Sequence, residues 1–441
     1  MPLRDLLLTM VVLGALPMIL MRPAIGILLW SWLGYMNPHR LAWGFASNFP
    51  WAQTIAGATL IGLVVTRGDK RLPKDVLVFL LIAFNVWMVV TTMFAIYPDG
   101  AWGKLDKVLK IQLMTLVTIA LIKDWRYLNA LIWVIVLSLG FYGVKGGIFT
   151  LLTGGQYRVR GPAESFIEGN TVLGLALLMV LPLMRYLQIH SDNRWVRQGL
   201  VVAMGLTMIA ILGTYSRGAF LGALIMGMFL VWKSPYRKRL VFAGVLLMVP
   251  FFAFLPQKWY DQMESIRHYE QDPSAIGRIH AWQFTWELAK ERPVTGFGFN
   301  PYSRENYRRY APHIDLAGRQ TPGAHSNYFK ALGEHGFPGL ILYAATLIVG
   351  YRRASWIIRR TRDRDDLKQA GTLAAMIQVS FVGYAVSGTF LNMTYFDMYY
   401  HLLAILVIMT VLLKPEFARE EGPVWNSRTP VRTALEGGRP V

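Results

Sequence analysis

The 441-residue sequence contains no cysteine and is poor in charge. The absence of cysteine excludes disulfide bonds, a catalytic thiolate and any metal site built on cysteine. Charged residues account for only 16% of the chain, compared with roughly 25% in soluble domains, whereas hydrophobic residues account for 54%. This composition predicts an all-α polytopic membrane protein.

The sequence also lacks a cleavable signal and an internal repeat. Its first twenty or so residues have no basic start and no small-residue cleavage site, so we expect them to belong to the fold. Transporters such as lipid-linked glycan flippases place ionisable groups near the membrane midplane and often contain inverted repeats. The apolar segments here are nearly free of charge at their centres, which disfavours transport.

The charge that is present is strongly basic, with a net charge of +19. In a soluble protein this excess would suggest a nucleic-acid partner. Most short basic runs here flank apolar segments, where they are typical of topology signals, so we expect no nucleic acid. We expect membrane lipids around the chain. The basic residues on the side of the membrane opposite these topology signals are expected to bind an anionic ligand.

Apolar segments of about 20 residues, the length that spans a membrane, fill most of the chain. Residues 1–36 are ambiguous, because Arg22-Pro23 splits them into either a kinked single crossing or two half-depth pieces. The remaining spans are predicted near residues 49–66, 76–94, 108–122, 128–152, 171–187, 196–213, 219–232, 240–255, 328–349, 371–390 and 398–413.

Basic loops alternate with loops poor in Lys and Arg, which sets the orientation. The positive-inside rule places the basic loops at 67–74, 123–126, 194–197, 233–239 and 352–368 in the cytoplasm. If residues 1–36 make one crossing, the chain has about twelve transmembrane helices with both ends cytoplasmic. The loops that carry Arg158, Arg160 and Arg217 then share the opposite, extracytoplasmic face with a long polar stretch.

This pattern divides the chain into four parts. Residues 1–255 form N-terminal transmembrane helices, 256–327 a large periplasmic loop, 328–413 C-terminal transmembrane helices, and 414–441 a disordered cytoplasmic tail. The long loop is predicted to contain an amphipathic helix that begins at Asp272-Pro273 and ends before Pro293. Its apolar residues at helical spacing are Ile279, Trp282, Trp286 and Ala289.

The acidic residues give no indication of a metal site. On the periplasmic side they are not closely paired, so we expect no metal and no cofactor; they are Glu164, Glu168, Asp261, Glu264 and Asp397. The run 363–366 matches the Asp-x-Asp pattern by which many glycosyltransferases hold a metal. It alternates with arginine in the most basic cytoplasmic loop, which favours a solvated run of charges.

His325 is the candidate general base. It precedes the span that starts at Tyr328, and its imidazole can accept a proton near neutral pH. The alternative is a histidine that hydrogen-bonds a helix end. The other histidines lack this context and are expected to be structural; they include His280, His313, His335 and His401.

Arginines are the candidate anion ligands. Arg217 lies in a very short turn between two apolar segments, where a guanidinium is costly unless it snorkels or meets an anion, and its fork suits phosphate oxygens. Arg278 lies in the long loop, and Arg158 and Arg160 lie in another periplasmic loop. Taken singly, each also fits a snorkelling residue, a solvated charge or a contact with lipid head groups.

As a set, these features resemble the O-antigen ligase and polymerase superfamily of the bacterial inner membrane. The resemblance covers about residues 169–413 and rests on Ser216-Arg217-Gly218, Gly277-Arg278, the Pro-x-x-Gly-x-Gly turn at 293–298, and a histidine motif that continues into Gly-Glu-His-Gly-Phe-Pro-Gly at 333–339. The opening of the chain, through residue 40, is similar to a branch of O-glycosylation ligases associated with exosortase systems. Many members have His-Asn, whereas this chain has His325-Ser326-Asn327, which moves the asparagine role to Asn327 or removes it.

The resemblance implies a GT-C-like glycosyltransferase that moves a glycan from undecaprenyl pyrophosphate to a hydroxyl of lipid A-core, with inversion and without a metal. It implies that Arg217 and Arg278 bind the pyrophosphate and that His325 is the base, with Arg158 and Arg160 as weaker phosphate ligands. Asn327 and Asp397 are possible supporting residues. A polymerase or a protein O-oligosaccharyltransferase needs the same donor chemistry and remains an alternative.

Overall fold

The structure is a computed structural model that describes residues 2–234, 237–239, 257, 259–260, 273–314 and 321–420. This part of the chain is all-helical, as predicted, and contains no strand. Eight of its helices are long and apolar enough to cross a membrane, so the chain is a multi-pass membrane protein. The predicted span 240–255, the acids Asp261 and Glu264, the cap Asp272 and residues 421–441 of the predicted tail lie outside the described residues. Residues 414–420, which were expected to be disordered, instead continue the last helix.

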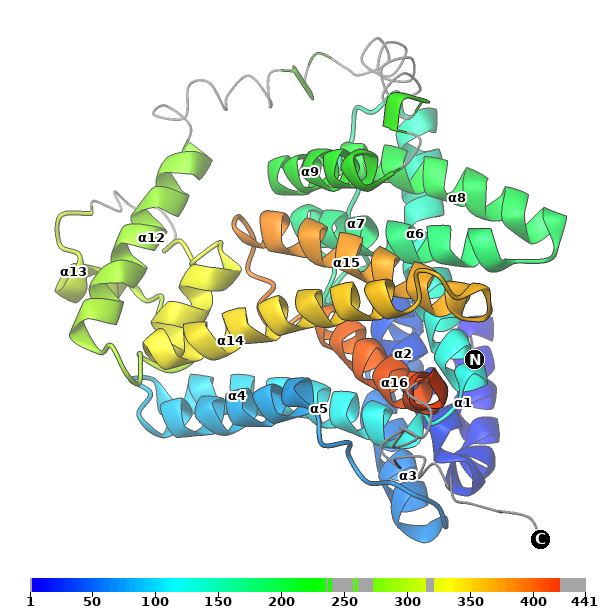
Figure 1. Cartoon of the computed structure of the whole chain (residues 1–441). Helices are drawn as coiled ribbons and strands as arrows, with labels where there is room; N and C mark the ends of the chain where they lie inside the picture. Colours follow the sequence, from blue (N-terminus) through cyan, green and yellow to red (C-terminus); the bar gives the residue numbers. More distant parts are fainter. Residues whose placement is uncertain are drawn as a thin grey trace, which may run out of the picture.

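The helices agree closely with the predicted spans (Figure 1). The long elements are α1 (Leu3–Met21), α2 (Pro23–Met36), α3 (Trp51–Val65), α4 (Val76–Met93), α5 (Pro98–Leu121), α6 (Trp125–Leu152), α7 (Asn170–His190), α8 (Arg194–Gly213), α9 (Arg217–Lys233), α12 (Pro273–Glu291), α13 (Arg304–Tyr310), α14 (Asn327–Arg360), α15 (Lys368–Gly388) and α16 (Asp397–Glu420), with short 3-10 turns η1 (Pro38–Leu41), η2 (Phe45–Ser47) and η3 (Asp365–Leu367). The main departures are α5, which begins at Pro98 rather than at Val108, and α14, which continues to Arg360 rather than ending near residue 349. In both helices, charged residues conceal the extra turns from a hydropathy pattern.

The first 36 residues form two antiparallel helices. α1 ends at Met21 and α2 begins at Pro23, so the proline marks the break, as expected. The start of α1 returns to the segment that follows α2: Arg4 donates to the Leu41 carbonyl (2.9 Å), and the Asp5 carboxylate accepts from the Ala46 amide (3.4 Å). A kinked single crossing is therefore wrong. Of the two alternatives, two separate pieces is the closer, and α1 alone is long enough to cross.

This hairpin changes the expected topology. Arg40, just after α2, pairs with Glu164, so the start of α1 lies at the same end of the bundle as the 153–169 connection. The end of α16 packs on the far end of α14, where Phe417 meets Trp356 (5.3 Å between ring centroids). The start of α1 and the end of α16 thus lie at opposite ends of the bundle. The prediction that both ends of the chain are cytoplasmic was made for a single crossing of residues 1–36 and loses that basis, and the total of about twelve helices stays a prediction.

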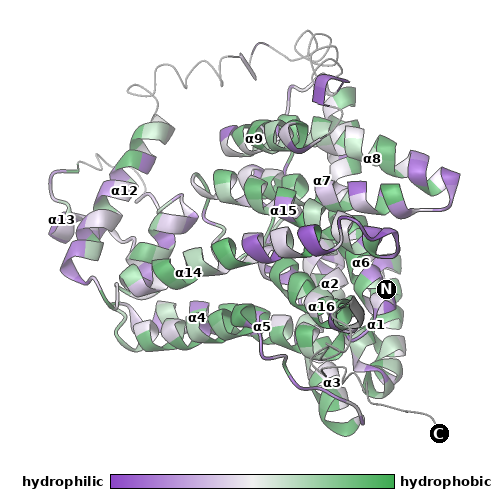
Figure 2. Ribbon diagram, in the orientation of Figure 1, coloured by the Kyte–Doolittle hydropathy of each residue, from purple (hydrophilic) through white to green (hydrophobic). Residues whose placement is uncertain are grey.

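The core is centred on α16. Its residues from 398 to 409 are at most 2% exposed, because α16 packs against α4, α5, α6, α14 and α15. A helix that is apolar on every side is stable only when other helices surround it. Figure 2 shows hydrophobic residues along these helices, with hydrophilic residues gathered on α12, on α13 and at the turn between α14 and α15.

The helical backbone of α14 is broken near its first turns. Gly336 has φ 67° and ψ −172°, a non-helical conformation that interrupts α14 two residues after Glu334. The segment 293–298 fills the break and satisfies the backbone groups that the break frees. The hydrogen bonds are Phe337 N to Pro293 O (2.8 Å), Phe297 N to Gly333 O (3.1 Å) and Gly298 N to Glu334 O (2.9 Å).

Two glycines make this contact possible. A Cβ on Gly336 would lie 2.2 Å from the Val294 carbonyl oxygen, and a Cβ on Gly296, whose φ is 61°, would lie 2.6 Å from the Gly336 amide nitrogen. Neither position can hold a larger residue without separating the two backbones. The Pro-x-x-Gly-x-Gly turn and the Gly-Glu-His-Gly-Phe-Pro-Gly run are therefore the two halves of one contact.

We predict that Gly336→Ala lowers the free energy of unfolding by at least about 1–3 kcal/mol, the cost of a strained backbone, with the clash against Val294 in addition. The thermal midpoint of the purified protein in detergent measures this loss. Gly205→Ala is the matched control, because it lies in α8 with nothing within 4 Å of its added methyl group. Equal midpoints for the two variants would contradict the role of the glycine.

Candidate functional site

Four connections meet at one end of the bundle, which we call the site end. They are residues 153–169, the turn 214–216, the described parts of 292–326, and residues 389–396. Backbone and side-chain contacts join them: Val159 N donates to Gly213 O (2.8 Å), and the Ser387 hydroxyl donates to Gly218 O (3.0 Å). The site end carries the charged and polar residues that the sequence singled out.

Arg217 is the first residue of α9. The Ser216 side chain caps this helix by accepting from the Ala219 amide (3.2 Å), which fixes the start of α9 at the arginine. The free amides at a helix start already form a positive pole, so a cation there is unfavourable by about 0.3–1 kcal/mol unless an anion is near. The half-buried Arg217 and the helix start together suit an anionic group.

The turn that carries Arg217 meets α12 through one aromatic residue. A Cβ on Gly218 would lie 3.3 Å from the Cβ of Phe390, and the Phe390 ring lies 6.3 Å from that of Trp282 on α12. Trp282 is one helical turn after Arg278. The long loop therefore folds back towards the Ser216-Arg217-Gly218 turn, as the shared-anion hypothesis requires.

α12 packs through a face that only partly matches the predicted one: Ala289 is buried and Trp282 stacks on Phe329, as a packed apolar face requires, but the other two predicted residues are exposed. Ala281, Phe284 and Leu288 are fully buried, whereas Ile279 and Trp286 are 36% and 47% exposed. The buried residues pack against α13, with the Phe284 and Tyr307 rings stacked at 3.8 Å. The helical period was correct, but tertiary contacts from α13 and α14 selected the inner face.

His325 is held in an unusual backbone conformation. Its φ is 45°, a left-handed value that is uncommon for residues other than glycine. The residues on either side fix it: the Ala324 carbonyl accepts from the Trp282 indole (2.9 Å), and the Ser326 hydroxyl caps α14. The strained residue lies at the start of α14 with its side chain exposed.

The surroundings of His325 lower its pKa. Neighbouring protein atoms desolvate the ring, although the residue is exposed on its other side, and this desolvation is the largest cause. The positive charges of Arg278 and Lys330 act in the same direction. Arg278 and His325, separated by 47 positions, are thus electrostatic neighbours, and the imidazole is kept neutral and able to accept a proton.

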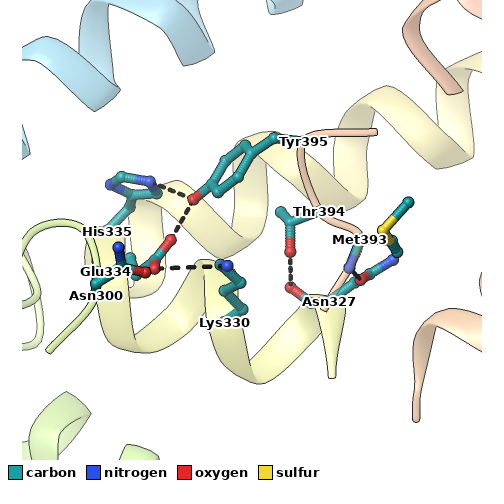
Figure 3. A network of polar contacts seen from close by, with 8 residues as sticks. All are labelled: Asn300, Asn327, Lys330, Glu334, His335, Met393, Thr394 and Tyr395. Carbon is teal, nitrogen blue, oxygen red and sulfur yellow. Dashed lines mark hydrogen bonds and ion pairs between the residues drawn. The ribbon is translucent and has the colours of Figure 1, made fainter. Parts of the chain in front are cut away.

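A buried polar network is built on the first turns of α14, which follow His325 in the chain (Figure 3). Tyr395 donates to the Glu334 carboxylate (2.6 Å), which also accepts from the Asn300 amide (3.0 Å). The Tyr395 hydroxyl lies 2.7 Å from His335 Nε2, and His335 Nδ1 lies 2.7 Å from the Thr91 hydroxyl. His335 is therefore part of the structural network, as the sequence suggested for it.

Two lysines near this network were missed in the sequence. Lys330 is 9% exposed, and its ammonium group lies 3.9 Å from the Glu334 carboxylate and 5.6 Å from the centre of the Tyr395 ring. Lys104 on α5 interacts electrostatically with both Lys330 and Glu334. For Lys330 the sequence did contain a signal. It lies four residues before Glu334 in the first turns of an apolar span, where charged residues are costly and usually functional.

Asn327 and Asp397 lie in structural positions. The Asn327 side chain accepts from the Met393 amide (2.6 Å), and its carbonyl accepts from the Thr394 hydroxyl (3.1 Å), so it anchors the 389–396 connection (Figure 3). Asp397 accepts from the Met398 amide (2.9 Å) at the start of α16 and faces Gly34 of α2. A role for Asn327 or Asp397 in supporting the reaction would be indirect, through the position of the 389–396 connection, and stays a prediction.

Arg158 and Arg160 lie on the other side of the Arg217 turn. The guanidinium of Arg158 lies 6.0 Å from the centre of the Tyr215 ring, and the Tyr215 hydroxyl donates to Gly155 O. Arg160 is exposed beside it. Arg158 thus meets the turn at Tyr215, whereas Phe390, which contacts α12, meets it at Gly218. As for metals, the described residues hold no group of three His, Asp or Glu side chains that suits an ion, and metal independence stays a prediction.

Comparison with known families gives two matches. Residues 199–344 match a family described as O-antigen ligase, and residues 3–192 match a family of unknown function. No curated protein matches the chain. The ligase segment runs from α8 into α14 and so includes Arg217, Arg278, His325 and the Gly336 break.

We predict that Arg278→Gln raises the pKa of His325, because it removes a positive charge that opposes protonation. A titration of the His325 ring followed by NMR in detergent micelles measures the change. Arg308→Gln, an exposed charge on α13, is the control and should leave the titration unchanged. A pKa of His325 that stays the same or falls in Arg278→Gln would contradict the proximity of the two side chains.

Proposed function

Because the chain carries an O-antigen ligase segment and belongs to the O-antigen ligase superfamily, we propose that it is an O-antigen ligase. It transfers a glycan from undecaprenyl pyrophosphate to a hydroxyl of lipid A-core, with inversion and without a metal, at the periplasmic face of the bacterial inner membrane. One observation carries this proposal: Arg278 and the proton acceptor His325 are electrostatic neighbours, and the turn with Arg217 meets the same α12.

The reaction needs a base and an anion site. Neutral His325 takes the proton of the acceptor hydroxyl, whose oxygen attacks the anomeric carbon as the bond from that carbon to the diphosphate breaks. The bonding pair leaves with the diphosphate, which is released as undecaprenyl pyrophosphate. Arg217 and Arg278 stabilise the charge that develops on it, and such a contact is far stronger at a water-poor membrane interface than in bulk water.

The cations of the site end favour an anionic donor. Among the described residues, Lys330 has one carboxylate within ion-pair reach, that of Glu334, and this carboxylate is already bound by Tyr395 and Asn300. Lys104 adds a second ammonium group nearby. The local excess of positive charge is costly unless a multiply charged anion such as a diphosphate offsets it.

Two other acceptors use the same donor site. A second lipid-linked glycan would make the protein a polymerase, and a protein hydroxyl would make it an O-oligosaccharyltransferase; membership of the exosortase-associated branch likewise stays a proposal. A flippase would need ionisable groups along a path through the membrane. The charged groups near His325 instead cluster at one end of the bundle, which favours transfer.

We predict that the purified protein, in excess EDTA, glycosylates lipid A-core from undecaprenyl-pyrophosphate glycan in preference to a glycan acceptor or a pilin-like protein. His325→Ala should reduce transfer by about 10²–10⁴, the usual loss for a general base, and leave donor binding nearly intact. Mass spectrometry of the acceptor and a donor-binding isotherm measure the two effects.

His325→Asn is the structural control for that variant. Asparagine tolerates a positive φ better than alanine but cannot act as a base, so it separates loss of the imidazole from backbone strain. Both variants should be inactive although folded. Transfer at the normal rate in folded His325→Asn, or activity that returns only with Mg²⁺ or Mn²⁺, would contradict the mechanism.

We predict that Arg217→Lys and Arg278→Lys each strongly impair transfer, because lysine keeps the charge but loses the planar fork that binds two phosphate oxygens. The double variant should be little worse than the worse single one, since groups that hold one diphosphate act as a unit. Initial rates at saturating acceptor measure this. Fully additive losses would mean that the two arginines hold different groups.

A further inference from the structure

A second basic site lies on the far side of the Arg217 turn. A cavity of about 250 Å³ lies between α6 and the 158–162 segment. Its lining includes three cations, Lys145, Arg158 and Arg160, and no acid. The rest is apolar or aromatic, including Tyr142 and Phe149.

Two of these cations, Lys145 and Arg160, have no acidic partner among the described residues. Glu164, on the same connection, pairs with Arg40, and the Glu168 carboxylate accepts from the Glu164 amide (3.0 Å). Lys145 and Arg160 make no hydrogen bond or ion pair with the described part of the chain. Lys145 also lies inside a membrane-length helix, where an ammonium group is costly without an anion.

An apolar stripe leads to this cavity along α6. Leu137 and Phe141 are 62% and 41% exposed and lie two turns and one turn before Lys145 on the same face of the helix. Phe149, one turn after Lys145, is 40% exposed. Exposed apolar side chains on a membrane-length helix contact lipid chains, so the cavity receives its ligand next to acyl chains rather than from open water alone.

The cavity also borders the proposed reaction site. Val159 donates to Gly213 O (2.8 Å), and Arg158 stacks over Tyr215, so the cavity packs on one side of the 213–218 turn. Phe390 and α12 pack on the other side, next to His325. A molecule in the cavity and a diphosphate on Arg217 would thus lie on opposite sides of one short turn.

We propose that this cavity binds the phosphate group of a phosphorylated lipid whose acyl chains lie along Leu137 and Phe141 of α6. Lys145 and Arg160 hold the phosphate, and Tyr142 and Phe149 contact the adjoining part of the lipid. The identification of this lipid with the acceptor of transfer rests on the proposed function, whereas the binding itself does not.

Short-chain phosphatidic acid, which is neither donor nor acceptor in the proposed reaction, tests the binding. Native mass spectrometry of the full-length protein in detergent counts bound lipid across a titration, with diacylglycerol and inorganic phosphate as the other two probes. We expect wild type to retain phosphatidic acid, to retain little diacylglycerol and to release the lipid only at a large excess of inorganic phosphate. Lys145→Gln/Arg160→Gln should weaken phosphatidic acid binding by about tenfold or more, since even one lost charge-assisted hydrogen bond is worth about that factor.

Arg308→Gln/Arg309→Gln is the matched control. It removes two exposed positive charges from α13, away from the cavity, and should bind phosphatidic acid as wild type does. Equal weakening in both double variants, unchanged binding in Lys145→Gln/Arg160→Gln, or displacement of the lipid by an equal concentration of inorganic phosphate would overturn the proposal. Lys145 and Arg160 are exposed, as are Arg308 and Arg309, so both double variants should elute as folded monodisperse species.

A kinetic measurement then tests the identity of the lipid. If the cavity holds the acceptor, Lys145→Gln/Arg160→Gln raises the KM for lipid A-core more than the KM for the donor. If phosphatidic acid binding is lost but both KM values stay unchanged, the lipid site stands and its assignment to the acceptor is wrong. If no glycan is transferred by wild type, the proposed function fails while the binding result is unaffected.

Discussion

The site end depends on the contact between the broken turn of α14 and the 293–298 segment. A membrane helix cannot leave backbone amides and carbonyls unpaired, so the break at Gly336 is stable only because this segment supplies the missing partners. The same contact fixes the segment that leaves α12, and with it the position of Arg278 relative to the start of α14. Together with the contacts of Trp282, it returns the long loop to the helix ends.

The break also creates the polar network on the first turns of α14. The Glu334 carboxylate is fully buried and is bound by Tyr395 and by the backbone of Asn300. Removing one partner of a buried charge typically costs about 3–5 kcal/mol, so the 389–396 connection, the 293–300 segment and α14 are coupled. Asn327 strengthens this coupling from the other side by holding Met393. These contacts fix the start of α14, and they hold the preceding residue His325 in a strained backbone conformation.

Positive charge is distributed over both sides of the Arg217 turn. Arg278 and Lys330 act on His325 on one side, and Arg158 with Arg160 lies on the other. Cations that face lipid or low-dielectric protein repel one another strongly, and this arrangement is favourable when anions occupy the space between them. In the proposed reaction, the diphosphate of the donor and the phosphate of the acceptor lipid are the two anions that would satisfy this condition.

The sequence by itself determined the helical class, most helix positions and the residue types of the site, because the length and polarity of apolar segments depend on local composition. It also indicated His325 and Arg217 through their places at the ends of apolar segments, and Arg278 through the family resemblance. It could not determine the antiparallel path of α1 and α2, since Arg22-Pro23 permits a kink or a turn and only the contacts of Arg4 and Asp5 select one. The inner face of α12 and the roles of Lys330 and Lys145 were likewise decided by the tertiary structure. Each depends on groups far away in the chain, and burial and electrostatic contact are properties of those distant neighbours rather than of local sequence.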